Sequence, residues 1–313
     1  MKFDIFVDSS ANLTEETIEE YSIKVIPYIC MCDGREVICY TGVKTFEEEA
    51  KDYYKAMAEG KDVSSSLVTK ERIMDAIEPS LKEGRDALMV TISAGVSGTY
   101  EQAVKATKEL MQKYPERKVY IADSANAGYG EGFLALYAAK LREIGEDFDT
   151  CVKWIENNKF RMNSSFTVSD LKWLKKGGRI STAVAIAGTI LNIKPILWAD
   201  AGPIAKIGVC GKVKGRKKSL AAIAETYREK AVFPEAQTVA ICHGDCEEDA
   251  LALAEMLKEY GATDITITYF DIVCGTHVGP GSLALFFLGK DRRGQTAEKT
   301  EKVPSPATAK NKI

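Results

Sequence analysis

The chain has 313 residues, enough for two domains with hydrophobic cores of their own. Hydrophobic residues make up 45% and charged residues 28%, the composition of an ordinary soluble globular protein. The formal net charge of −3 argues against nucleic acid as the partner, because nucleic-acid-binding proteins carry strongly basic surfaces.

The first half of the sequence alternates short apolar runs with amphipathic stretches of helical spacing. Residues 2–10 carry two aspartates inside an apolar run and have no small-residue cleavage site, so they predict a first strand and not a signal peptide. Thr14 is a predicted helix cap. Strands that alternate with helices of this length predict parallel βα units, and hence a doubly wound α/β domain over residues 1–160. The further strands are expected at 24–32, 33–40, 86–92 and 118–124, and the helices at 14–21, 45–60, 69–84, 97–114 and 130–145.

The second half has a different pattern and predicts an α+β domain over residues 161–290. Strands are expected near 161–170, 194–215, 237–245 and 264–271, with helices at 171–192, 217–231 and 247–261. Gly177 and Gly178 interrupt the first of these helices. Residues 291–313 contain almost no large apolar side chain and are predicted to be a disordered tail.

Neither a stable membrane anchor nor a metal site is expected. The longest apolar stretch, residues 181–197, is interrupted by Asn192 and Lys194 and is too short to span a bilayer. Eight cysteines without a secretion signal predict reduced thiols and a cytoplasmic protein. Cys242, His243 and Cys246 cluster, but a zinc site needs about four closely spaced ligands, so packed thiols are the preferred interpretation.

The stretch SAGVSGTY, residues 93–100, is predicted to bind an anion. Ser93 ends a predicted parallel strand, where ligands of such sheets bind. Gly98 lets the backbone approach a ligand closely, and Ser97 or Thr99 can cap the helix that follows. A helix N-terminus with free N–H groups favours negative charge.

Three other loops rich in short polar residues, at 8–14, 63–69 and 122–132, predict one pocket rim with many donors. The stretch SAGVSGTY holds no lysine and does not match the phosphate-loop pattern GxxxxGK[ST]. A carboxylate needs only two or three N–H or O–H donors, so it suits the predicted rim better than a nucleotide phosphate does.

Several motifs resemble those of the DegV family, the fatty-acid-binding proteins that serve bacterial fatty acid kinase. They are FDIFVDSSANLT, SAGVSGTY, LKWLKKGGRIS, GKVKGRKKSL and GTHVGPGSLALFF, and the resemblance covers about residues 1–289. It implies two α/β-type domains with a tunnel between them that holds one long-chain fatty acid. It further implies that the carboxylate is presented to the kinase catalytic subunit, which makes the acyl phosphate for phospholipid synthesis. No cofactor and no catalytic residue of the binder itself are implied.

The same resemblance assigns the carboxylate contacts to Ser93, Ser64 and His277. Ser64 takes the place of a threonine in a Thr-Ser-Gln-Pro-Ser-like loop, and this chain reads SSSLV there, without the proline. His277 also stands out by itself, since it lies among glycines in CGTHVGPG and can donate to a carboxylate. Ser65, Ser97, Gly98, Thr99 and Arg179 are further candidates for the pocket or its interface.

Three features are left with two interpretations each. Arg179 either reaches the pocket mouth or supports the domain interface. The basic run that contains Lys214 and Arg216 is either a solvated turn or a docking patch for an acidic partner, here the kinase. Residues 182–193 are core, or as a set they line an acyl channel.

Enzymatic alternatives rest on the same residues. A serine hydrolase would use Ser93 and His277, but the GxSxG elbow is absent and no acid is paired with the histidine in the sequence. A phosphotransferase acting on a small acyl or phosphate substrate is the other alternative, and it lacks a phosphate loop.

Overall fold

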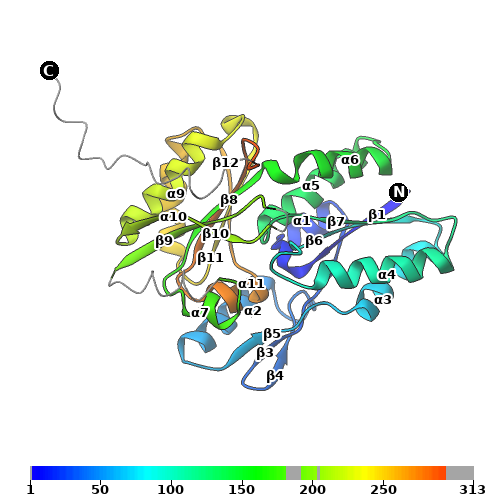
Figure 1. The fold of residues 1–313 in the computed structure, drawn as a ribbon, viewed down its shortest axis with the longest axis horizontal. Coiled ribbons are helices and arrows are strands. Elements are labelled where there is room, and N and C mark those ends of the chain that lie inside the picture. The colour runs from blue at the N-terminus through cyan, green and yellow to red at the C-terminus, as the bar shows by residue number, and fades with distance from the viewer. Residues whose placement is uncertain (1, 181–191, 203–204, 294–313) are drawn as a thin grey trace.

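The structure, a computed structural model, describes residues 2–180, 192–202 and 205–293, which form two large β-sheets, a small third sheet and the helices around them (Figure 1). The predicted fold class is confirmed: a parallel α/β sheet comes first and a mixed α+β part follows. Residues 182–191 of the predicted acyl channel lie outside the described residues, and so do residues 294–313 of the predicted tail.

The first sheet has four parallel strands in the order β2-β1-β6-β7. β1 lies inside the sheet and is buried along its whole length, which explains its nearly continuous apolar sequence. Because the strands are parallel, all their carboxyl ends meet at one edge. The strands are β1 (Phe3–Asp8), β2 (Ile23–Ile26), β6 (Asp86–Thr91) and β7 (Val119–Asp123), and their helices are α1 (Glu15–Glu20), α3 (Lys70–Lys82), α4 (Thr99–Lys113), α5 (Tyr129–Glu143) and α6 (Phe148–Asn158).

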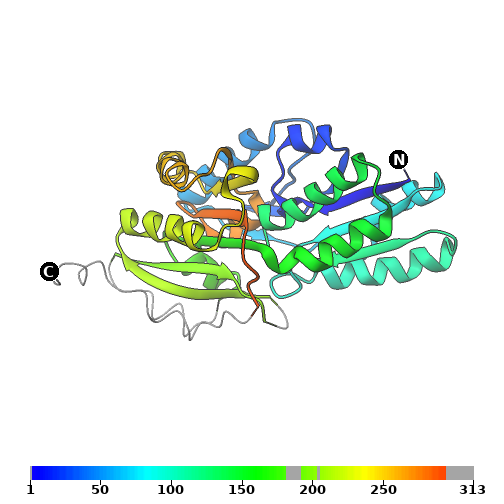
Figure 2. The same cartoon turned by 90° about the horizontal axis from the view of Figure 1, so that it is seen from above.

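The second sheet has six strands in the order β10-β9-β8-β13-β11-β12, and only β11 and β12 pair in parallel. Helices α9 and α10 pack beside each other, and Figure 2 shows α9 lying against β9 and β10. The strands are β8 (Met162–Thr167), β9 (Ile193–Ala199), β10 (Ile207–Lys214), β11 (Thr238–His243), β12 (Asp264–Tyr269) and β13 (Leu283–Leu288), and the helices are α7 (Lys172–Lys176), α9 (Arg216–Lys230), α10 (Glu247–Lys258) and α11 (Ile272–Val278).

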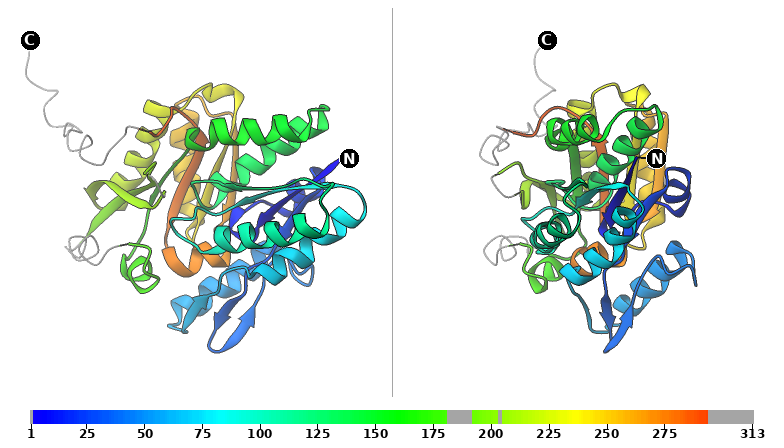
Figure 3. Two further views of the ribbon diagram at one scale, coloured as in Figure 1. Left: turned by 45° about the vertical axis from the view of Figure 1, so that its right-hand side comes forward. Right: turned by 90° about the vertical axis from the view of Figure 1, so that its right-hand side faces the viewer.

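A small antiparallel sheet, β4-β3-β5, was not predicted. The expected strand over residues 24–32 is two strands in different sheets, β2 and β3 (Cys30–Cys32), with Pro27 between them. Proline has no N–H to give to a ladder, so the chain leaves the first sheet there. β4 (Arg35–Val37) and β5 (Val63–Ser65) complete the small sheet, and α2 (Phe46–Ala58) connects them. Figure 3 shows this part of the chain projecting beside α11, which contacts both α2 and β5.

One hydrophobic core joins the two large sheets. It runs from Phe6 and Leu88 in the first sheet to Phe166 and Phe286 in the second. A smaller core lies under α9 and α10. Three short 3-10 helices, η1 (Ser9–Ala11), η2 (Lys159–Arg161) and η3 (Pro234–Ala236), connect larger elements.

The folded chain continues past residue 290, where the tail was predicted to begin. Arg292 is fully buried, and its guanidinium donates to the carbonyls of Ala125, Lys159, Ala199 and Asp200. The sequence interpretation considered only large apolar side chains and so missed a charged residue that the fold buries. No helix in the described part of the chain is both long enough and apolar enough to cross a membrane.

Candidate functional site

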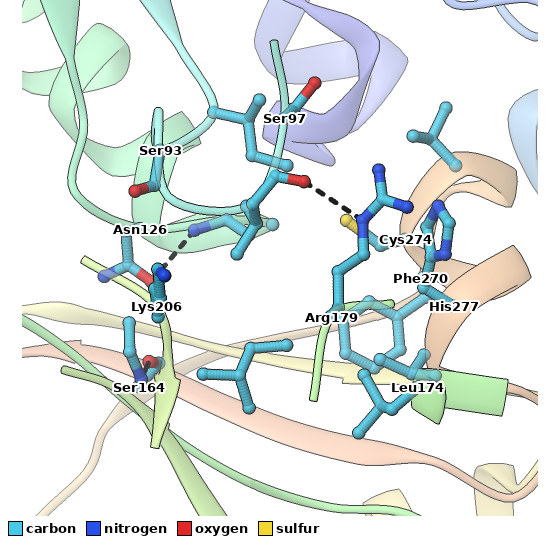
Figure 4. A pocket seen from close by; sticks show the side chains of 18 of the residues that line it. Ser93, Ser97, Asn126, Ser164, Leu174, Arg179, Lys206, Phe270, Cys274 and His277 are labelled. Atoms are coloured by element: carbon cyan, nitrogen blue, oxygen red, sulfur yellow. Dashed lines mark hydrogen bonds between the residues drawn. The ribbon is translucent and has the colours of Figure 1, made fainter. Parts of the chain in front are cut away.

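A pocket with a volume of about 220 Å³ lies between the two large sheets, beyond the carboxyl ends of β6 and β7. Ile92, Ser93 and residues 126–128 line it from the first sheet. From the second sheet it is lined by Phe166 of β8 and Phe286 of β13. Ser65 of the short β5 and residues of the helix α11, among them Cys274 and His277 (Figure 4), also line it. The pocket therefore lies at the edge where ligands of parallel sheets bind.

Most of the pocket wall is apolar. Phe270 and Phe286 meet edge to face, with ring centroids 6.5 Å apart. Gly128 has a φ of +59°, and a Cβ there would lie 2.9 Å from Cζ of Phe286, so the phenyl ring packs directly on the glycine backbone. Leu174, Val278 and Ala284 extend the same wall. Such a surface suits a hydrocarbon ligand.

His277 and Ser65 form a polar pair in this wall. Oγ of Ser65, at the end of β5, lies 2.9 Å from Nε2 of His277 on α11. Nδ1 of His277 is buried without a hydrogen-bond partner among the described residues, and the ring packs against the backbone of Gly177. Burial, followed by the positive charge of Arg179, lowers the pKa of His277 to about 4, so the imidazole is neutral at pH 7. A neutral imidazole beside a hydroxyl can donate one hydrogen bond to an anion without carrying a charge itself.

Ser64, a predicted carboxylate contact, does not line the pocket, whereas the adjacent Ser65 does. Both residues lie on β5, where Ser64 pairs with Met31 and Ser65 pairs with Cys30. Ser64 is exposed, whereas Ser65 is half-buried and lines the pocket. Neighbouring residues of a strand point to opposite faces, so only one of the two serines can face the pocket.

Ser93 lies in the pocket wall, as predicted, but its hydroxyl is already bonded. Its Oγ donates to the carbonyl of Ala205 at 2.7 Å and accepts from the amide of Gly95 at 3.1 Å. Its own amide donates to the carbonyl of Asn126. Figure 4 shows Ser93 and Asn126 across the pocket from His277. Two of the three predicted carboxylate contacts are therefore separated, with His277 and its partner Ser65 on one side of the pocket and Ser93 on the other.

The N-terminus of α4 differs from its prediction. Gly98 is the cap residue and makes no side-chain cap bond, but Oγ of Ser97 accepts from the amide of Thr99, the first helical residue, at 3.3 Å. Oγ1 of Thr99 instead lies 2.6 Å from the hydroxyl of Tyr28, which also contacts Ser97 at 3.1 Å. Tyr28, Ser97 and Gly98 line the pocket, and Thr99 supports them from behind. Tyr28 was missed, because nothing in its sequence surroundings separates it from a core tyrosine.

Arg179 fulfils both of the interpretations left open for it. It lines the pocket beside His277 (Figure 4), and its Nε donates to the carbonyl of Val96 in the predicted anion-binding stretch at 3.0 Å. The guanidinium also bonds to the carbonyl of Gly177. Burial lowers the pKa of Arg179, but arginine stays charged in proteins. Arg179 thus places a fixed positive charge next to the His277–Ser65 pair, and Lys206 also lines the pocket.

The predicted docking residues Lys214 and Arg216 differ in their surroundings. Arg216 is half-buried and its Nε lies 2.8 Å from Oδ2 of Asp249, so it joins α9 to α10. Lys214, Lys217 and Lys218 are exposed. Any docking role of this basic run therefore falls on the lysines, whereas Arg216 also has a structural role.

In the described part of the chain, the contacts of the cysteine–histidine cluster are not those of a metal site. The contacts of Ser93 and His277 are not those of a serine hydrolase. The amide of Cys246 donates to Nδ1 of His243, and its thiol donates to the carbonyl of Ser282. His277 contacts Ser65 and not Ser93, and its Nδ1 has no carboxylate partner in the described part of the chain. This arrangement is not that of a Ser-His-acid triad.

The fold and the pocket define an α/β protein with two large sheets and a mainly apolar pocket between them. Residues 2–290 match the family described as "Uncharacterised protein, DegV family", and the chain belongs to that family. It is 40% identical over 290 residues to a DegV domain-containing protein of Clostridium perfringens, covering 92% of this chain and 98% of the relative.

Two solved structures share the fold at 28% identity. A DegV lipid-binding protein from Thermotoga maritima matches with a TM-score of 0.79 over 94% of this chain and 100% of its own. DegV, a fatty-acid-binding protein from Bacillus subtilis, matches with a TM-score of 0.77 over 91% of this chain and 98% of its own. The predicted resemblance is confirmed.

Proposed function

We propose that this protein binds one long-chain fatty acid in the pocket between its two large sheets. The observation that carries the proposal is an apolar wall that ends at a polar group of Ser65, His277 and Arg179. The acyl chain lies along Phe166, Phe270 and Phe286, and the carboxylate lies at the polar group. The fatty-acid-binding protein of Bacillus subtilis, with the same fold, supports the same ligand class.

The polar group suits a carboxylate because it offers donors and a fixed positive charge. Ser65 can turn its hydroxyl proton from His277 toward the ligand, and the neutral imidazole can donate its own N–H. Arg179 stands beside both and compensates the ligand's charge inside the protein. Ser93 lies on the opposite side of the pocket, and its hydroxyl is free to donate to a ligand only when it leaves the carbonyl of Ala205.

Native mass spectrometry of the protein purified from bacterial cells tests ligand binding directly. We expect a mass increment that corresponds to a long-chain fatty acid. A protein that is empty and that also fails to take up added fatty acid contradicts the proposal.

Ser65→Ala is expected to weaken the binding of a fatty acid more than that of the matching fatty alcohol. A hydrogen bond to a charged group contributes about 1.5–3 kcal/mol, which corresponds to roughly 10- to 150-fold in the dissociation constant. Titration of both ligands by calorimetry measures the difference. Ser64→Ala is the matched control, because Ser64 is the adjacent residue on β5 and faces solvent. Equal losses for acid and alcohol would show that Ser65 does not contact the carboxylate.

We further propose that the bound carboxylate is presented to a fatty acid kinase for acyl-phosphate formation. The exposed lysines that flank the start of α9, Lys214, Lys217 and Lys218, support this docking role. Grouped positive charges accelerate encounter with an acidic partner.

Charge reversal at Lys214 and Lys218 is expected to leave fatty acid affinity unchanged and to slow acyl-phosphate formation at least tenfold at low salt. The difference from the unaltered protein should shrink at high ionic strength, because screening removes the same attraction from both. Reversal of Lys105 and Lys108, two exposed lysines of α4, is the matched control. Kinase turnover that is unaltered at low salt, or that falls equally in the control, contradicts the docking assignment.

A further inference from the structure

Three fully buried side chains behind the pocket form a continuous hydrogen-bonded chain. Oγ of Ser10, in η1, lies 2.5 Å from Oδ1 of Asp8 and 2.9 Å from Oε2 of Glu131 on α5. The other oxygen of Asp8, Oδ2, accepts from the amide of Ile92 at 3.0 Å. Ile92 lines the pocket and precedes Ser93, so this chain ends in the pocket wall.

The single hydroxyl proton of Ser10 limits how the hydrogen-bonded chain of Asp8, Ser10 and Glu131 can be protonated. A hydroxyl has one hydrogen and can donate to only one of the two carboxyl groups. The oxygen of the other carboxyl group must therefore donate a hydrogen bond to the serine hydroxyl. This requires that this carboxyl group be protonated. Two ionised carboxylates on the two sides of one hydroxyl would leave one pair of oxygens without a hydrogen between them.

The surroundings decide which carboxyl group carries the proton. Asp8 accepts from the amides of Ser10 and Ile92 as well as from the Ser10 hydroxyl, and such donors favour the ionised form. Among the described residues the carboxyl group of Glu131 has a hydrogen bond only with Ser10, and its Oε1 is buried without a partner. An ionised Glu131 would thus be a poorly solvated charge beside another one.

We propose that Glu131 is a neutral carboxylic acid in the folded protein, whose proton is donated to Ser10 so that Ser10 can donate its own proton to Asp8. Glu131 is then a positioning residue. It acts through Ser10 and Asp8 on the amide of Ile92. Because Glu131 is neutral, the hydrogen-bonded chain of Asp8, Ser10 and Glu131 carries one negative charge instead of two.

The groups that face Glu131 point to the same assignment. They are Asp8 from β1, Asp123 from the end of β7, Asp271 and Cys274 at the start of α11, and Tyr28 between β2 and β3. All of them are acids or neutral groups. Burial, followed by the charge of Asp8, raises the pKa of Glu131 well above its ordinary value.

The pH dependence of unfolding tests this proposal with Glu131→Gln, whose amide can donate to Ser10 as the proposed acid does. Above the ordinary pKa of glutamate the unfolded chain loses this proton and the folded chain keeps it, so rising pH favours unfolding. The unfolding constant of the wild type, relative to that of the variant, should increase about tenfold per pH unit between about pH 5 and 7. Asp8 and Asp271 are present in the wild type and in the variant, so their own titrations cancel in the ratio of the two unfolding constants.

Glu143→Gln, which removes an exposed carboxyl from the same helix, is the matched control. A ratio for Glu131→Gln that does not change with pH overturns the proposal, because Glu131 is then ionised in both states. Unfolding of the wild type and of the variants is measured without a fatty acid. A negative result for Glu131 is therefore distinguishable from a failure of the proposed fatty-acid-binding function.

Infrared spectroscopy of the wild type tests the protonation of Glu131 independently, and it does not require that Glu131→Gln folds. With ¹³C in the glutamate carboxyl groups, we expect a protonated-carboxyl band at neutral pH that shifts in Ser10→Ala, where the acceptor is lost. Absence of such a band, or a band that Ser10→Ala leaves in place, overturns the assignment.

Discussion

Arg292→Ala is expected to lower the free energy of unfolding by about 3–5 kcal/mol. The guanidinium is fully buried and donates to four carbonyls that come from three parts of the chain. Ala125 follows β7, Lys159 begins η2, Ala199 ends β9 and Asp200 follows it. Alanine leaves these carbonyls without donors and also leaves a cavity beside Phe160, against which the guanidinium packs. Urea unfolding followed by circular dichroism measures the loss.

Arg293→Ala is the matched control, because Arg293 is the adjacent residue, is exposed and forms its ion pair with Asp291. An exposed ion pair contributes about 0–1 kcal/mol, so this variant should be nearly as stable as the wild type. Arg292→Lys should recover only part of the loss, since a lysine cannot present the planar fork that reaches four carbonyls. Equal stabilities of Arg292→Ala and Arg293→Ala would show that the buried contacts do not stabilise the fold.

The stability that depends on a neutral His277 is expected to be lost at acid pH. Burial and the charge of Arg179 lower the pKa of His277 from 6.5 to about 4 in the folded protein. Between these two values the unfolded chain binds a proton at this residue and the folded chain does not, so a fall in pH favours unfolding. The effect is about 1.4 kcal/mol per pH unit, or about 3 kcal/mol from pH 6.5 to pH 4.

His277→Gln removes this titration and keeps a side chain that can bond to Ser65. The difference in unfolding free energy between wild type and His277→Gln should therefore fall by about 3 kcal/mol between pH 7 and pH 4. Ser65→Ala is the control that should keep the wild-type pH dependence, because burial and Arg179, and not Ser65, displace the pKa of His277. An NMR titration of the His277 ring with a midpoint near 6.5 would contradict this account.

A bound fatty acid carboxylate should reverse part of the pKa displacement at His277. The anion favours the protonated imidazole, which opposes the effect of burial and of Arg179. The same NMR titration with ligand present should give a higher pKa than without ligand. A rise in the pKa of His277 on ligand binding would show that the carboxylate lies beside this residue and not elsewhere in the pocket.

The sequence by itself determined the class of fold and the edge of the sheet where the site lies. Apolar runs of strand length, alternating with helices, require parallel pairing because the connections are long enough to cross over. Hydroxyl and glycine residues directly after the strands of residues 86–92 and 118–124 then have to meet at the carboxyl edge. Ser93, His277 and Arg179 do line one pocket there.

Only the tertiary structure decided which individual side chains face the pocket and which groups carry charge. Ser65 and not Ser64 lines the pocket because the register of β5 against β3 determines which face each serine occupies, and neither segment alone specifies that pairing. Tyr28, Glu131 and Arg292 have sequence surroundings like those of ordinary core, helix and tail residues. Their roles come from partners far along the chain, as for Ser10 and Glu131, whose residue numbers differ by 121. Burial among such partners changes proton affinities and hydrogen-bond needs, and burial is a property of the folded chain.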